Sequence, residues 1–242
     1  MKRSLLLLST LFWFTGLYAQ FDVSIQANSG PFHYTGSSAT ATTVFWPSTG
    51  YNNAYVITPF GANNAFSYEI GAKVQYVANG FIVGLQSNFQ SLRSSEAITQ
   101  ASPYNGMIIF FGIANPSNIS ATGTAYLRTE YIDVNPYIGY RISTKKLKID
   151  LMPGVDIGYI TDSHSYGQVT DVNGHYTFDN KMDFGTVHKD WRLKFEAVVW
   201  YKRFGINASQ SVGLTNYTGD SPVNTQNAKS RLTLFGISYR IL

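Results

Sequence analysis

The stretch from Ala65 to Gln90 has the pattern of a β-hairpin, and it constrains the fold more than any other part of the chain. Apolar residues alternate with polar or small ones from Phe66 to Tyr76 and again from Phe81 to Phe89. Asn79-Gly80 lies between the two arms and is a strong hairpin signal, because both residues adopt positive φ readily. One such hairpin fits a soluble two-layer protein. Its recurrence along the chain predicts a transmembrane β-barrel.

The first 19 residues have the features of an export signal. Lys2 and Arg3 precede a short apolar core, and the segment ends at Ala19, a small residue typical of a cleavage site. The core is shorter than the ~20 apolar residues that a membrane-spanning helix needs. We therefore expect a cleaved signal peptide over residues 1–19 and one barrel domain over residues 20–242. The chain has no Cys, so we expect neither a lipid anchor nor disulfides.

The composition excludes several classes of protein. The net charge of +4 falls to +2 without Lys2 and Arg3, and no basic run is interleaved with aromatic residues. We therefore expect no nucleic-acid partner. A second apolar stretch of ~18 residues is absent, which argues against a helical membrane protein. Charged residues make up only 13% of the chain, against 17 Tyr and 16 Phe, as expected for strands with aromatic girdles at two membrane interfaces.

The spacing of the alternating segments predicts eight principal strands. Short and long connections follow one another in turn, which is typical of an outer-membrane barrel with periplasmic turns and extracellular loops. The sheet must close, because an open edge in lipid would leave backbone groups unpaired. Ten strands result if the first or second long connection adds strands to the wall. Short turns are expected near Asn79, Lys145 and Lys202, and long loops near residues 30–64, 91–123, 161–190 and 218–228.

Some segments within these connections carry their own predictions. Val44–Trp46 and Tyr55–Ile57 are expected to extend the barrel walls outward. Met107–Ala114 is an uninterrupted apolar run, for which a short buried strand is preferred over a loop plug or an extra wall strand. Pro136 counts against a central strand in the segment that ends near Ile142, because Pro cannot donate to the ladder, but a β-bulge in a barrel wall can accommodate it at the cost of one ladder bond.

The chain resembles a known group of proteins in four places. These are the signal ending in Ala19-Gln20, the Asn79-Gly80 hairpin, the segment Gly213–Asn216 and the terminal strand Phe235–Ile241. Together they resemble the small outer-membrane β-barrel proteins of Bacteroidetes, the PorT-like and OmpA-type group. The resemblance implies an all-β, single, antiparallel up-and-down transmembrane barrel in the cell outer membrane, surrounded by its lipid. It also implies that the barrel-assembly machinery reads the terminal strand through Phe235, Ile237, Tyr239 and Ile241.

The inward face of the predicted strands carries charges of both signs. Eight strands leave an interior only wide enough for side chains, and buried charges persist when they are paired. We therefore expect a paired charge network that fills the lumen, rather than an ion-conducting path. Its predicted members are Glu69, Lys73, Asp133, Arg141, Lys148, Asp150, Asp156, Arg192, Lys194 and Glu196.

No motif predicts a catalytic residue, a cofactor or a metal site. His164, His175 and His188 share one connection, but neither His-x-His nor His-x-x-x-His spacing occurs, so we expect solvated loop residues. The segment from Asp171 to Gly174 opens like a calcium loop and lacks the later bidentate acid, so we expect a plain turn. No elbow or spacing singles out a nucleophile.

Three functions are consistent with this sequence. The first is a non-enzymatic barrel whose extracellular loops bind a partner protein or a surface ligand, with an envelope or secretion role. Aromatic residues in the first loop support it, although packing of loop against loop explains them equally well. The second is a small-solute channel, which needs a wider barrel or unpaired lumen charges. The third is a hydrolase at the barrel rim, for which His164, His175 and His188 are the residues to substitute.

Overall fold

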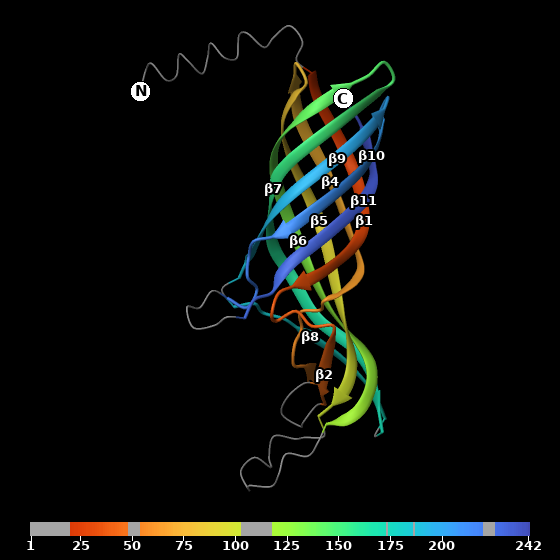
Figure 1. The fold of residues 1–242 in the computed structure, drawn as a ribbon, viewed down its shortest axis with the longest axis vertical. Coiled ribbons are helices and arrows are strands. Elements are labelled where there is room, and N and C mark those ends of the chain that lie inside the picture. The colour runs from red at the N-terminus through yellow and green to blue at the C-terminus, as the bar shows by residue number, and fades with distance from the viewer. Residues whose placement is uncertain (1–19, 48–53, 103–117, 173, 186, 220–225) are drawn as a thin grey trace, which may run out of the picture.

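A computed structural model describes residues 20–47, 54–102, 118–172, 174–185, 187–219 and 226–242 (Figure 1). The predicted signal peptide and the apolar run at 107–114 lie outside these residues. None of the described segments is a helix long and apolar enough to cross a membrane. The strands are β1 Gln20–Thr35, β2 Thr42–Trp46, β3 Tyr55–Val56, β4 Asn63–Ala78, β5 Phe81–Ala101, β6 Ile119–Ser143, β7 Leu147–Asp171, β8 Gly174–Lys181, β9 Lys189–Tyr201, β10 Phe204–Gly213 and β11 Lys229–Arg240.

An antiparallel sheet closes on itself in a ring of eight strands. The order around the ring is β1, β4, β5, β6, β7, β9, β10 and β11, and β11 pairs with β1 to close it. The predicted all-β antiparallel architecture and its eight principal strands are therefore confirmed. The other three strands, β2, β3 and β8, pair beyond the ring and add nothing to its wall.

Three tight turns join strands at one end of the ring, which we call the turn end. Asn79 and Gly80 connect β4 to β5 with φ of 50° and 86°, in the left-handed region that this dipeptide tolerates. Residues 144–146 connect β6 to β7, and Lys202-Arg203 connect β9 to β10, with Lys202 at φ 55°. The three predicted short turns are thus confirmed. The long connections all lie at the opposite end, which we call the loop end (Figure 1).

At the loop end, β5, β6 and β7 continue well beyond the ring, into segments predicted to be loops (Figure 1). There β2 pairs in parallel with β5, β3 pairs with β2, and β8 pairs with β7. The predicted wall extensions at Val44–Trp46 and Tyr55–Ile57 therefore exist as β2 and β3. The extension encloses its own apolar core, whose buried members include Phe45, Ile98 and Phe178.

Pro136 lies in β6 without a bulge, because the pairing of β6 with β7 keeps one register from Val134 to Tyr137. The register shifts instead between Glu130 and Tyr131, where Thr161 is the extra residue on β7. A bulge reverses which residues of a strand face outward. Odd-numbered residues of β7 therefore face outward before Thr161, and even-numbered ones after it.

The ring has an apolar outside and a charged inside. The most exposed apolar side chains include Ile206 at 72% and Phe204 at 69%, whereas Lys73 and Asp150 inside the ring are 1% and 0% exposed. Aromatic pairs such as Phe81 with Tyr140 lie near the turn end. The outward surface, called the apolar belt below, includes Phe21, Ile25, Phe66, Ile70, Val74, Phe81, Val83, Leu85, Phe89, Ile132, Ile138, Tyr159, Trp191, Leu193, Phe195, Phe204, Ile206, Phe235, Ile237 and Tyr239.

Candidate functional site

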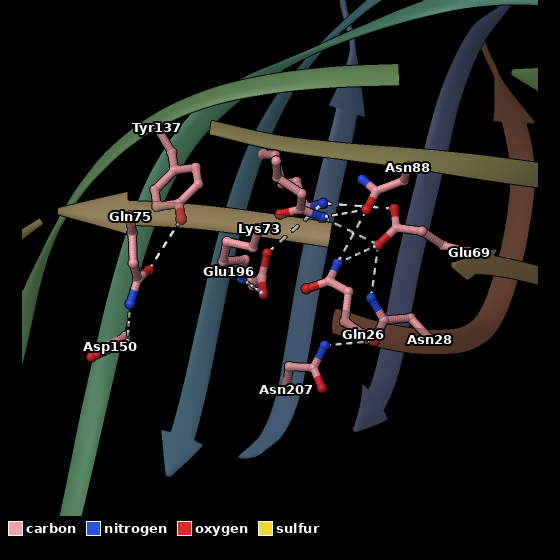
Figure 2. Close-up of polar contacts among 12 residues, drawn as sticks. Gln26, Asn28, Glu69, Lys73, Gln75, Asn88, Tyr137, Asp150, Glu196 and Asn207 are labelled. Atoms are coloured by element: carbon pink, nitrogen blue, oxygen red, sulfur yellow. Dashed lines mark hydrogen bonds and ion pairs between the residues drawn. The ribbon is translucent and has the colours of Figure 1, made fainter. Parts of the chain in front are cut away.

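The interior of the ring is a polar network that connects strands on opposite walls. In its middle, Lys73 Nζ of β4 lies 2.5 Å from Glu196 Oε1 of β9, four strands away in either direction around the ring (Figure 2). Glu69 accepts hydrogen bonds from Asn28 at 2.7 Å and from Gln90 at 2.6 Å. The Lys73–Glu196 pair crosses the lumen, and the Glu69 contacts join neighbouring strands, so together they fill the lumen with side chains.

At the turn end, the network is built around one arginine. Arg141 makes a bidentate contact with Asp150, at 2.6 and 2.7 Å, and its Nη1 lies 2.8 Å from Asp22 Oδ2. The Trp200 indole also donates to Asp150 at 2.9 Å, and the Arg240 guanidinium lies 4.3 Å from the centre of the Trp200 ring. Bidentate pairing and stacking are the geometries that make arginine favourable at buried positions.

At the loop end of the lumen, Arg192 is the central cation. It donates to Gln90 Oε1 at 2.6 Å, and its Nε lies 3.8 Å from both Asp156 and Asp190. Its guanidinium also lies 5.4 Å from the centre of the Tyr131 ring. Ser211 donates to Asp156 at 3.0 Å and Ser230 donates to Asp190 at 2.8 Å, so each carboxylate has a second partner.

A cluster of buried aromatic side chains covers this end of the network. Tyr34 packs edge-on against Phe60 and Tyr217, with ring centroids 5.2 Å apart in both cases. The hydroxyls of Tyr131 and Tyr217 are 2.7 Å apart, which joins the cluster to the wall of the ring. This aromatic cluster separates the charged lumen from the loop-end extension.

The structure brings nine of the ten predicted lumen residues into the ring interior, each at most 5% exposed. Lys148 is the exception: it is half-buried and lines a groove at the turn end beside Arg141. Asp22, Asp190 and Arg240 are also buried in the network and were not predicted. They lie near strand ends, and only their inward position in the alternation could have identified them.

The three histidines of the third connection are not gathered into a metal site. His164 Nδ1 lies 2.7 Å from Asp179 Oδ1, and Thr170 and His175 are paired at 2.7 Å. No group of three or more His, Cys, Asp or Glu in the described part of the chain is arranged to hold a metal ion. The N–H of Gly174 donates to Asp171 at 3.1 Å, as in an ordinary turn.

A groove of about 810 Å³ lies on the loop-end extension, over β6, β7 and β8. Tyr126 and Tyr166 stack at its edge with ring centroids 5.5 Å apart. Threonine, glutamine, histidine and aspartate side chains supply hydrogen-bonding groups along it, including Thr124, Gln168 and His175. Sequence reasoning missed this groove, because it treated these residues as parts of loops.

Behind this groove, Glu96 of β5 is buried in the extension at 2% exposure. Thr40 donates to its Oε1 at 3.1 Å, while Oε2 has no partner among the described residues. Burial raises the pKa of the Glu96 carboxyl to about 8, and the hydrogen bonds from Thr40 and Thr43 offset this only in part.

No family model and no curated protein matches the chain. One similar solved structure is Ail, the attachment invasion locus protein of Yersinia pestis, in complex with the heparin analogue sucrose octasulfate. The two sequences are 11% identical and the TM-score is 0.32, and the match covers 93% of this chain and 100% of Ail. Another is Neisserial surface protein A, at 14% identity and a TM-score of 0.38, covering 92% and 98% of the two chains. Similarity this weak transfers neither family nor function, so the resemblance to the PorT-like group remains a prediction.

Proposed function

We propose that this chain is an exported, non-enzymatic outer-membrane β-barrel protein, with a closed lumen and a loop-end surface that binds a partner or surface ligand. The observation that carries the proposal is the reversal of polarity around the ring. Phe81, Ile206 and Phe235 are 60 to 72% exposed, while charged side chains fill the interior. In water that arrangement would expose apolar surface on every strand of the ring, whereas in a bilayer it places that surface in lipid.

Two further features support a membrane location. All backbone groups of the ring have neighbouring strands to pair with, as a bilayer requires. Aromatic pairs lie at the edges of the apolar belt, with Phe204 and Tyr239 near the turn end and Tyr68 and Phe89 toward the loop end. Tyr and Phe at both edges suit the two interfaces of a membrane.

The orientation follows from the connections. Outer-membrane barrels have short periplasmic turns and longer extracellular loops. We therefore place the turn end in the periplasm and the loop-end extension outside the cell. In this proposal residues 1–19 are the export signal, and the barrel-assembly machinery recognises β11, whose Phe235, Ile237 and Tyr239 face outward. A PorT-like role in secretion belongs to the same proposal.

Binding at the loop end is favoured over conduction through the barrel. The cross-lumen contacts Lys73 to Glu196 and Arg192 to Gln90 occupy the interior, and the aromatic cluster covers one end of it. A small-solute channel would need these contacts to be absent. We therefore expect no stable open level in planar-bilayer recordings of the wild-type protein, whereas regular steps of conductance would favour the channel.

The absence of Cys allows a direct test of the orientation. Lys181 of β8 and Lys145 in a tight turn are both exposed, so each can be replaced by Cys singly. A membrane-impermeant maleimide added to intact cells should label the Lys181→Cys variant, and should label Lys145→Cys only after the outer membrane is permeabilised. The opposite pattern would contradict the proposed orientation, and equal labelling in a soluble fraction would contradict the membrane location.

A further inference from the structure

Four basic side chains form one continuous row across the outward face of the loop-end extension. Arg93 of β5 is directly opposite Arg128 of β6, Arg128 is opposite His164 of β7, and His164 is opposite Lys181 of β8. Arg93 and Arg128 are like charges directly opposite each other across the sheet, which is destabilising. A row of this kind is therefore better explained by an anionic ligand than by the stability of the sheet.

Among the four residues of this basic row, only the two central ones, Arg128 and His164, lie close to a carboxylate in the described part of the chain. Arg128 lies 3.7 Å from Glu130 and 4.0 Å from Asp162, and His164 lies 2.7 Å from Asp179. Neither of the two cations at the ends of the row has a carboxylate within 4.0 Å among the described residues. The guanidinium of Arg93 instead lies 5.2 Å from the centre of the Tyr126 ring, with Nη1 3.4 Å from the Tyr166 hydroxyl, and its Nε has no partner there. The Arg93 guanidinium is therefore held in place without a counter-ion.

The groove described above begins at this row and continues away from the ring. Tyr126 and Tyr166 occupy the next outward positions on β6 and β7 after Arg128 and His164. Beyond them the groove is lined by hydroxyl and amide side chains such as Thr124 and Gln168. Aromatic side chains beside amide and hydroxyl groups match the chemistry of a sugar, which has apolar C–H faces and hydroxyl edges.

The distance from the apolar belt indicates where such a ligand would be anchored. The last belt row on these strands contains Phe89, Ile132 and Tyr159, and the basic row lies two outward positions further along β5 and β6. Four residues of a strand tilted by about 40° rise about 10 Å above the hydrocarbon. This height is greater than the thickness of a phospholipid headgroup layer, which is roughly 5–8 Å. A lipid that reaches the basic row therefore needs a larger headgroup.

From these observations we propose that the basic row and the groove bind the headgroup of a phosphorylated glycolipid in the outer leaflet. Its phosphate groups contact Arg93 at one end of the row and Lys181 at the other, and its sugar rings occupy the groove beside Tyr126 and Tyr166. This inference rests on the proposed outer-membrane location, and it names the ligand class of the loop-end surface. The shared chemistry is that of a phosphorylated sugar, and the lipid-anchored form is favoured because the basic row lies close above the belt.

The test measures binding of deep-rough lipopolysaccharide, which contains lipid A and inner-core sugars, to the full chain folded in detergent. The Arg93→Gln/Lys181→Gln double variant should bind about tenfold or more weakly, because two cations near the phosphates are lost. Gln168→Trp, which fills the groove, should also weaken binding. The matched control is Lys145→Gln/Lys146→Gln, which removes two exposed cations from the turn end and should leave the affinity unchanged.

Each probe has an outcome that decides the proposal. Equal affinity of the wild-type protein and the Arg93→Gln/Lys181→Gln variant would overturn it. So would undiminished binding of dephosphorylated lipid A, or equally tight binding of phosphatidylglycerol vesicles. Displacement by millimolar inorganic phosphate or by soluble core oligosaccharide would reassign the site to a free ligand. Each variant is first checked for a heat-dependent gel shift. A wild-type protein that lacks the shift contradicts the proposed function itself, separately from ligand binding.

Discussion

Lys73 and Glu196 form an ion pair across the full width of the barrel, with 2.5 Å between Nζ and Oε1, and they belong to strands that are four steps apart around the ring. Both side chains are almost fully buried, at 1% and 3% exposure. Removing one partner of a buried pair leaves an uncompensated charge and typically costs about 3–5 kcal/mol. Lys194 Nζ still lies 3.9 Å from Glu196 Oε2 in the variant, so Lys73→Met should lower the free energy of unfolding by about 3 kcal/mol, the lower end of that range, in urea titrations of the folded barrel.

The double variant Lys73→Met/Glu196→Met distinguishes the cost of leaving one buried charge unpaired from the net contribution of the ion pair to stability. Replacing both members by apolar side chains of similar volume is often close to neutral. We expect the double variant to recover most of the stability that Lys73→Met loses. A double variant that stays as unstable as Lys73→Met would show that the pair itself holds the walls together.

Gly84 makes room inside the ring for a large side chain on the next strand. It is paired with Tyr137, and a Cβ at Gly84 would overlap the Tyr137 ring. Tyr137 in turn donates to Gln75 at 3.1 Å, so displacing its ring would also break a lumen contact. Gly84→Val should destabilise the barrel by about 1–3 kcal/mol. Ser87→Val, at an exposed position of the same strand, is the control and should be nearly neutral.

The apolar belt makes a prediction about charge in lipid. Phe195 lies midway along β9 and is 49% exposed on the outer face. Arg at the midplane of a transmembrane barrel costs about 2–4 kcal/mol. Phe195→Arg should therefore reduce stability by that much in lipid vesicles, whereas Lys146→Arg in a turn should not. An unchanged stability of Phe195→Arg in vesicles would show that this face does not contact lipid.

The loop-end extension should respond to pH through Glu96. Its pKa is raised from 4.5 to about 8, so the folded extension binds this proton more tightly than the unfolded chain does. Stability is then highest below the unfolded pKa and is lost as the pH rises through the window from about 4.5 to about 8. Glu96→Gln should remove this loss, which we expect to be about 1–3 kcal/mol because hydrogen bonds and solvent moderate it.

Amide hydrogen exchange of β2 and of the outer part of β5 measures this effect locally, after correction for the intrinsic pH dependence of exchange. In the wild-type protein, protection should fall between pH 5 and pH 8.5. In Glu96→Gln it should stay constant. Equal pH dependence in the two proteins would assign the titration to another group.

The ring could be predicted from the sequence because its alternation has a single phase. In the hairpin around Asn79-Gly80, most outward residues are apolar and most inward ones are polar, with Val77 and Ile82 beside the turn as inward apolar exceptions, so a period of two is visible in the residues themselves. The turn at Asn79-Gly80 could be predicted because both residues adopt positive φ readily, and those near Lys145 and Lys202 because a few polar residues separate two alternating segments. Nine of the ten predicted lumen residues lie inside for the same reason.

The strand extensions could not be predicted because the apolar residues change faces at the edge of the belt. Within the belt they face outward, and in the extension they face inward. Phe89 is apolar and faces outward, while Leu92 is apolar and buried inside the extension. On β6 the same change separates Ile132, which faces outward, from the buried Leu127. A sequence pattern that changes phase looks like a strand end. The individual ion pairs were also beyond prediction, since partners such as Lys73 and Glu196 depend on how the closed ring brings opposite walls together.

The most direct test of the central claim is the gel mobility of the native protein from an outer-membrane fraction, with and without boiling in SDS. A closed barrel whose backbone groups are all paired resists SDS until it is heated. We predict a band in that fraction that changes mobility on boiling. A protein found in the soluble periplasm, with the same mobility before and after boiling, would contradict the account and would require the aromatic face to be the core of a soluble β-sandwich.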